Sequence, residues 1–262
     1  MPSNDNGPVG DLAKQPVDLL VCFAVKEEAK FFLPYPMRPV PSERPSKERN
    51  KPEPQKAKSA SKRPSRRPMQ EGGICQVWMT GIGRANAARS IRQAISLVKP
   101  ERVITAGFAG GLNPELKLGT VLYDQDYDAG FAPELEDLGA LPAKFYCHRR
   151  VAITAQEKRD LWKSTGADAV EMESSVIRTI CREFHIPSAT IRVISDDASQ
   201  DLPLDFNALM TSQDRINYLK LIWAVLSRPS RIPKLIEFQR HTVLAARRLG
   251  TVLEELLRAE RC

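Results

Sequence analysis

Short apolar segments alternate with segments of helical spacing along most of this chain, and no other feature constrains the fold as much. Helices are predicted at 84–98 and 173–184, where apolar residues recur every three to four positions. Strands are predicted in the short apolar runs at 17–25, 74–79, 102–107, 119–126 and 188–196. This alternation predicts an α/β fold, a three-layer αβα sandwich around a mixed central sheet.

A segment of different composition, residues 34–70, interrupts the pattern. Nine of the 20 prolines lie between residues 34 and 68, with almost no large apolar side chains. Such a segment cannot bury enough surface to offset the entropy lost on ordering, so we predict a disordered basic insertion. It interrupts a single domain that spans residues 1–262. A tolerated surface insertion is one interpretation, and a basic tether to RNA or an anionic surface is the other.

The formal net charge of +7 is local. Residues 38–68 hold 11 Lys or Arg and 3 Asp or Glu, which leaves 28 basic and 29 acidic residues elsewhere. We therefore expect no nucleic-acid partner for the folded domain. The five cysteines are scattered without metal-ligand spacing, and neither a signal peptide nor an apolar run of about 18 residues is present. These features predict a cytoplasmic protein with no metal and no cofactor.

Three polar motifs follow predicted strands, where ligands bind in open α/β sheets. TGIG at 80–83 begins a partial GxGxxG whose third glycine is Asn86, so a dinucleotide site is disfavoured. GFAGGL at 107–112 is predicted to be a loop, either a plain turn or one whose backbone N–H groups approach a ligand. SDD at 195–197 is the third motif.

Acidic side chains gather at the same predicted sheet edge. They are Glu27 and Glu28 after the first strand, Glu171 and Glu173 around Met172 at a helix start, and Asp196 and Asp197 at a strand end. Helix starts favour acidic residues for structural reasons, so each pair alone has an ordinary explanation. Together the pairs supply three carboxylate groups, which is sufficient for acid/base chemistry on a sugar bond.

Five stretches of this sequence resemble the nucleoside phosphorylase superfamily, in the order found there. They are AVKEEA at 24–29, TGIGRANAA at 80–88, AGFAGGLNPELKLGTVLYDQD at 106–126, DAVEMES at 168–174 and IRVISDDA at 191–198. The similarity extends to methylthioadenosine/S-adenosylhomocysteine nucleosidases. It implies an enzyme, expected to be a homodimer, that cleaves the N-glycosidic bond of a 5′-substituted adenosine and releases adenine.

The resemblance also implies roles for individual residues. Asp196, held by Ser195, would protonate or hydrogen-bond N7 of the purine, so we expect it in a desolvated pocket that raises its pKa. Glu28 would orient the attacking water. Substrate contacts are expected from Glu173 at the ribose hydroxyls, Met172 on the sugar face, Phe206 over the 5′ substituent, and from Glu171, Gly107, Phe108, Val151 and Ala152.

Several residues depart from the pattern of that superfamily. Phe108 stands where members often have Ser or Thr, and Thr105 stands where purine nucleoside phosphorylases have a phosphate-binding Arg. The segment 147–152 replaces the base-binding S-G-D-x-F, with Val151 at the position of the stacking aromatic. The loss of a phosphate clamp favours water over phosphate as the nucleophile, unless Arg84 or another basic residue supplies the clamp.

A C-terminal helical extension is predicted at 212–262, with helices at 216–226 and 236–257 separated by prolines. EKRDLWKSTGADAVEMES at 157–174 together with LSRPSRIPKL at 226–235 resembles hopanoid-associated phosphorylases, which implies adenosylhopane as an alternative substrate. The last helix would pack on the sheet, or would make weak contact with an anionic membrane. A catalytically degenerate nucleoside-binding protein is a further alternative, and a Rossmann dehydrogenase is the least favoured.

Overall fold

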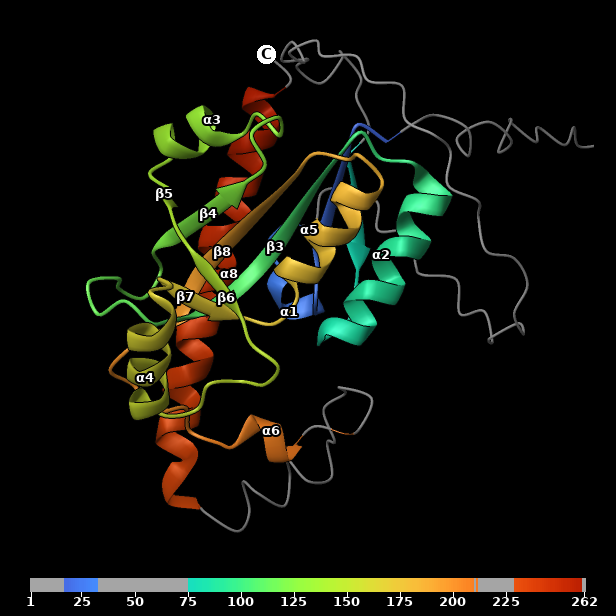
Figure 1. Cartoon of the computed structure of the whole chain (residues 1–262). Coiled ribbons are helices and arrows are strands. Elements are labelled where there is room, and N and C mark those ends of the chain that lie inside the picture. Colours follow the sequence, from blue (N-terminus) through green and yellow to red (C-terminus); the bar gives the residue numbers. More distant parts are fainter. Residues whose placement is uncertain (1–16, 33–74, 210, 212–228, 261–262) are drawn as a thin grey trace, which may run out of the picture.

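A central sheet lies between two layers of helices in the computed structural model, which describes residues 17–32, 75–209, 211 and 229–260 (Figure 1). The strands are β1 Leu19–Phe23, β2 Cys75–Met79, β3 Arg102–Gly111, β4 Val121–Gln125, β5 Leu141–Pro142, β6 Phe145–Cys147, β7 Ala169–Glu171 and β8 Ser188–Asp196. The helices are α1 Lys26–Ala29, α2 Arg84–Val98, α3 Ala132–Asp137, α4 Ala155–Thr165, α5 Ser174–Glu183, α6 Phe206–Leu209 and α8 Ile232–Ala259, preceded by the 3-10 turn η1 Pro229–Arg231. The predicted α/β sandwich is confirmed.

The sheet is mixed, as predicted. Its strand order is β2-β1-β3-β8-β4-β5, and β7 pairs with both β3 and β6. Strands β2, β1, β3 and β8 run parallel, whereas β4 is antiparallel to β8 and β7 is antiparallel to β3. The carboxyl ends of the parallel strands therefore meet at one edge, where side chains from distant parts of the sequence come together.

The two helical layers bury their apolar faces against opposite sides of the sheet (Figure 1). Helices α2 and α5 cover one side, where Ile91 and Ile177 pack with Leu20. Helix α8 covers the other side through the second half of its length, and Leu249 and Leu253 are fully buried there or nearly so. No helix within the described ranges is both long enough and apolar enough to cross a bilayer.

The glycine-rich segment is part of a strand, so its prediction as a loop was wrong. Strand β3 continues through Gly111, and none of its glycines has a positive φ. The glycines serve close packing instead, because a Cβ on Gly107 would overlap the Glu28 carboxylate. A Cβ on Gly110 would lie 3.1 Å from Asp196 Oδ2. Two acidic side chains therefore lie against the backbone of β3.

Helix α4 was not predicted, although its boundaries carry ordinary signals. The Thr154 hydroxyl accepts the Glu157 N–H at 3.1 Å, and Gly166 ends the helix with φ 60°. Helix α8 begins earlier than predicted because Pro233 lies in its first turn, where proline is tolerated. The predicted insertion at 34–70 and the predicted helix at 216–226 lie entirely outside the described residues.

Candidate active site

A cavity of about 270 Å³ opens at the carboxyl ends of β1, β3, β7 and β8. Ten of the eleven residues predicted for the site line it: Glu28, Phe108, Val151, Ala152, Glu171, Met172, Glu173, Ser195, Asp196 and Phe206. The eleventh, Gly107, lies against Glu28 and makes room for its carboxylate. The structure thus brings the predicted residues together, while the role of each in substrate binding or catalysis stays a prediction.

Glu28 is held in the first turn of α1 by backbone donors. Its Oε2 accepts the N–H groups of Ala24 at 2.8 Å and Val25 at 3.2 Å, and its Oε1 accepts that of Phe108 at 3.0 Å. Burial raises the pKa of Glu28, although Arg192 and these three N–H groups oppose the shift. Such a carboxylate can take up a proton from a bound water at neutral pH.

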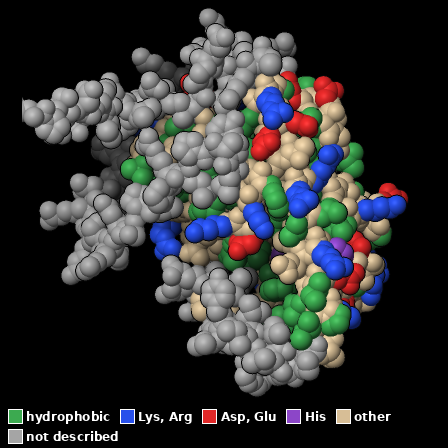
Figure 2. Space-filling model, turned by 180° about the vertical axis from the view of Figure 1, so that it is seen from behind, with side chains coloured by type: hydrophobic (Ala, Val, Ile, Leu, Met, Phe, Trp, Pro, Cys, Tyr) green, Lys and Arg blue, Asp and Glu red, His purple; other side chains and the backbone are tan. Residues whose placement is uncertain are grey.

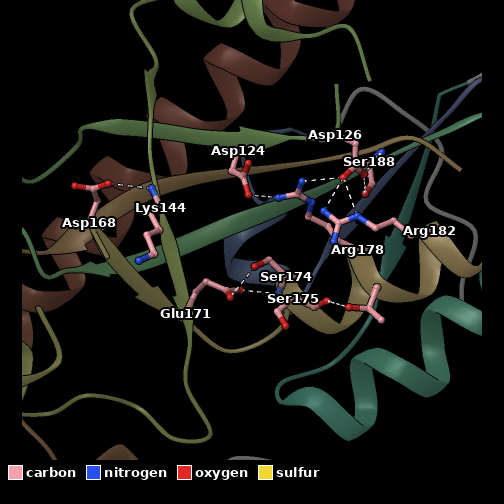
Figure 3. Close-up of polar contacts among 11 residues, drawn as sticks. Asp124, Asp126, Lys144, Asp168, Glu171, Ser174, Ser175, Arg178, Arg182 and Ser188 are labelled. Atoms are coloured by element: carbon pink, nitrogen blue, oxygen red, sulfur yellow. Dashed lines mark hydrogen bonds and ion pairs between the residues drawn. The ribbon is translucent and has the colours of Figure 1, made fainter. Parts of the chain in front are cut away.

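Glu171 forms a buried ion pair with Arg192, a residue of β8. Arg192 Nη2 donates hydrogen bonds to Glu171 Oε2 at 2.9 Å and to Thr105 Oγ1 at 3.1 Å. Burial alone would raise the pKa of Glu171, but the Arg192 charge and donors at the α5 start lower it overall. These donors include the Ser174 hydroxyl at 2.7 Å (Figure 3). The Glu171 oxygens are therefore engaged by the protein itself.

Glu173 caps the start of α5 and faces the cavity. Its Oε1 accepts the Gly83 N–H, from the TGIG turn, at 2.8 Å. Burial and the negative charge of Glu171 raise the pKa of Glu173 to about 8. A neutral carboxyl group both donates and accepts hydrogen bonds, so Glu173 has the chemistry to bind vicinal sugar hydroxyls near neutral pH.

Asp196 ends β8 and has donors at both oxygens. Its Oδ1 accepts the Ser195 hydroxyl at 2.8 Å, and its Oδ2 accepts Lys158 Nζ at 2.5 Å. Lys158, on α4, has no solvent-exposed side-chain surface. The sequence predicted that Ser195 holds this carboxyl group in a desolvated pocket, and Asp196 is buried beside Ser195. The buried cation Lys158 was not predicted, because α4, which carries it, was not recognised.

Aromatic side chains form one wall of the cavity. Phe206 of α6 packs against Phe238 of α8, with ring centroids 5.5 Å apart. The segment behind them is fixed by Asn207, whose side-chain amide exchanges two hydrogen bonds with the Val151 backbone, each of 2.9 Å. Phe238 was not predicted as a site residue, because its place in the helix predicted at 236–257 could not reveal this contact.

A second ionic cluster anchors α5 to the sheet away from the cavity (Figure 3). Asp126 accepts hydrogen bonds from Arg178 at 3.0 Å, Arg182 at 2.7 Å and the Ser188 hydroxyl at 2.7 Å. Arg178 also pairs with Asp124. Burial acts to raise the pKa of Asp126, but Ser188 and the two arginines lower it overall. The cluster fixes the helix that Glu173 directly precedes.

Sequence reasoning missed three residues of the site. Arg192 lies four positions before Asp196 on β8, but the pairing of β3 with β8 shifts register between Ala109 and Gly110, so strict alternation gave no usable signal for its pairing with Glu171. Lys158 follows the Thr154 cap by four residues, and recognition of that cap would have placed it on a helix. Phe238 had no such signal.

Comparison with known proteins defines the class to which this fold and this carboxylate-lined cavity belong. The family model described as the Phosphorylase superfamily matches residues 69–139 and 144–227, which include Glu171, Glu173 and Asp196. The chain belongs to this superfamily.

Relatives and solved structures agree with that assignment. A 5'-methylthioadenosine/S-adenosylhomocysteine nucleosidase of Glaesserella parasuis is 30% identical over 165 residues, 50% of this chain and 71% of that protein. Futalosine hydrolase of Helicobacter pylori superposes with a TM-score of 0.60 at 14% identity, covering 93% of this chain and 98% of its own. The Neisseria meningitidis 5'-methylthioadenosine/S-adenosylhomocysteine nucleosidase, in complex with methylthio-immucillin-A, gives 0.59 at 16% identity, covering 92% and 98%. At these identities the two structures establish the fold alone.

Proposed function

We propose that this protein hydrolyses the N-glycosidic bond of a 5′-substituted adenosine and releases adenine. The observation that carries the proposal is the convergence of Glu28, Glu173 and Asp196 on one cavity of about 270 Å³ at the strand ends. The similarity to a 5'-methylthioadenosine/S-adenosylhomocysteine nucleosidase supports the same reaction class.

Each carboxyl group has a part in the proposed reaction. Asp196, on the Ser195 side of the cavity, donates a proton to N7 of the purine as the bond between C1′ and N9 breaks, so that the base leaves as neutral adenine. Glu173 binds the ribose hydroxyls while positive charge develops on the sugar. Glu28 orients a water molecule and accepts its proton as the water attacks C1′. The products are adenine and the 5′-substituted ribose.

Water is the proposed nucleophile because groups that could hold phosphate are already engaged. The Phe108 N–H donates to Glu28 at 3.0 Å, and its side chain carries no hydrogen-bonding group. The Thr105 hydroxyl accepts from Arg192 at 3.1 Å, and Arg192 also pairs with Glu171. Arg150 is the basic residue among the described residues that line the cavity, and its guanidinium pairs with Glu157 at 2.7 Å.

A second candidate substrate carries a large apolar 5′ group, as adenosylhopane does. The aromatic pair Phe206 and Phe238 lines the cavity. An apolar substituent would gain from covering this surface. A homodimer and a nucleoside-binding protein without turnover also stay proposals.

One assay tests the reaction and separates the candidates. Adenine release is measured from 5'-methylthioadenosine, S-adenosylhomocysteine and adenosine, each with and without inorganic phosphate, and from an adenosine with a long 5′-alkyl chain. We expect release from a 5′-substituted nucleoside that does not depend on phosphate. Phosphate dependence would replace hydrolysis with phosphorolysis, and nucleoside binding without any release would support the degenerate alternative.

A further inference from the structure

A fully buried lysine lies directly behind Asp196. Lys158 comes from α4, and its Nζ donates to three oxygen atoms: Asp196 Oδ2 at 2.5 Å, Asp197 O at 2.7 Å and Gln200 O at 3.1 Å. An ammonium group has three hydrogens, so each has an acceptor. The geometry is therefore complete without any contact to solvent.

Burial of the Lys158 ammonium group costs free energy, which its hydrogen bonds must offset. Transfer of an ammonium group out of water costs several kcal/mol even after relaxation, and an apolar side chain would fill the same space without that penalty. The other charged residues of α4 lie at least partly in solvent, whereas Lys158 has no exposed side-chain surface. Its position thus points to a task at Asp196 and not to packing alone.

The contacts of Lys158 fix both the carboxylate and the chain that follows it. With Lys158 on Oδ2 and the Ser195 hydroxyl on Oδ1, the Asp196 carboxylate has a donor at each oxygen and cannot rotate freely. The two carbonyl contacts hold residues 197–200, which lead to Leu202 on the cavity wall.

We propose that Lys158 is a positioning residue that aligns Asp196 with the purine and acts on the reaction only through that carboxylate. This inference rests on the proposed function. It requires that the loss of Lys158 matter when Asp196 is present and matter little when Asp196 has been replaced.

A double-mutant cycle tests this requirement with Lys158→Met, Asp196→Asn and the double variant. We expect Lys158→Met to lower kcat for adenine release by about tenfold or more, with a smaller change in KM. In the Asp196→Asn background the same change should cost less than about twofold. Lys163→Met is the matched control, because Lys163 is an exposed residue of the same helix and its loss should leave kcat unchanged. Equal losses in both backgrounds would overturn the proposal.

A binding measurement gives a readout that does not depend on turnover. 9-Deazaadenine carries a hydrogen on N7 and adenine does not, so an aligned Asp196 carboxylate should favour 9-deazaadenine. We expect this preference in the unchanged protein and its loss in both single variants. If Lys158→Met keeps the preference that Asp196→Asn loses, Lys158 does not position the carboxylate.

Folding and the proposed function are controlled separately. Melting temperatures identify a variant that fails to fold, and Lys158→Gln, which keeps an N–H donor, then enters the same cycle. If the unchanged protein releases adenine but the cycle is additive, only the inference about Lys158 fails. If the unchanged protein releases no base and shows no preference between the two purines, the proposed function itself fails.

Discussion

The two sides of the cavity handle negative charge in different ways. On the side where we propose that the sugar binds, Glu28, Glu171 and Glu173 face one cation, Arg192, which pairs with Glu171. On the proposed base side, Asp196 has a cation of its own, Lys158. The consequence is visible on the sugar side, where Glu171 keeps a lowered pKa while the pKa values of Glu28 and Glu173 are raised. Burial raises the pKa of both of these carboxyl groups, and the opposing charge of Arg192 is engaged by its ion pair with Glu171.

The largest expected effect of breaking this arrangement is at the base side. Asp196→Asn should lower kcat for adenine release by about a hundredfold or more, the usual scale for loss of a general acid. The fold should persist, because the Asn oxygen can still accept one of the two donors. Steady-state kinetics and thermal unfolding measure the two effects. A near-normal rate on a substrate that the unchanged protein cleaves would show that another group activates the base.

A smaller effect on rate is expected at the sugar side. Glu173→Gln should lower kcat/KM for a ribonucleoside by about tenfold. The amide has one oxygen where the carboxyl group has two, so it cannot make the same hydrogen bonds to the ribose hydroxyls. Gly83 keeps an oxygen acceptor in this variant. Kinetics on the ribonucleoside measure the loss, and a 2′-deoxynucleoside is the control because it lacks one of the hydroxyls. Equal losses on both substrates would argue against contact with the 2′-hydroxyl.

The same variant tests whether Glu173 holds a proton. Its pKa is raised from 4.5 to about 8 by burial and by Glu171. The folded chain then binds more protons than the unfolded chain between these values, so the associated stability is full below the lower value and is lost as pH rises toward 8. Gln stays neutral throughout. We therefore expect the melting temperature of Glu173→Gln to rise relative to the unchanged protein between about pH 5 and about pH 8. A constant difference would mean that Glu173 is ionised in the folded state.

Strand ends and helix starts were the parts of this site that the sequence could predict. Glu173 and Asp196 lie where an apolar strand pattern stops or a helical pattern starts, and those boundaries follow from local periodicity. The glycines of β3 were wrongly predicted to form a loop, because a tertiary contact requires them and not a turn. Gly107 leaves room for Glu28, which lies 79 positions earlier in the chain. Periodicity in β3 carries no information about that contact.

Lys158 shows a different limit of sequence-based prediction. A lysine in a polar helix is normally a solvated residue, and its neighbours on α4 fit that pattern. Its burial depends on how α4 lies beside the end of β8, which is set by packing between segments about 38 residues apart. The exposed apolar residues of α8 are a related case: Ile236 and Leu244 were predicted as apolar positions of a packed helix, yet they are 47% and 48% exposed.

A smaller effect, on stability alone, is expected at Asp126, which pairs with Arg178 and Arg182 of α5. The pKa of Asp126 is lowered overall, against burial, by Ser188 and two arginines. Its contribution to stability is therefore present above the unfolded pKa and is lost as pH falls through the lower folded value. Asp126→Asn should lower the melting temperature at neutral pH and should matter less at about pH 3. A pH-independent difference would assign the loss to packing and not to charge.

The smallest expected effect concerns Arg240, Arg247 and Arg248, which are exposed on α8. The second half of α8 packs on the sheet, as one of the two interpretations predicted, but its first half exposes Ile236 and Leu244 beside Arg240 and Arg247. Basic, acidic and hydrophobic side chains are interspersed on the described part of the face in Figure 2, without a continuous basic patch. A membrane contact here would thus be weak, since each basic residue near an anionic surface contributes about 1 kcal/mol.

We expect slight, salt-sensitive co-sedimentation with phosphatidylserine vesicles, reduced when Arg240, Arg247 and Arg248 are all replaced by Gln. Adenine release should not change in this variant, because none of the three residues lines the cavity. Vesicles of neutral phosphatidylcholine serve as the control, since they present no net charge to the arginines. Because screening is weakest at low ionic strength, any electrostatic attachment must be visible there first. If no sedimentation occurs at low salt, α8 has no membrane role and its exposed arginines only keep a packed helix soluble.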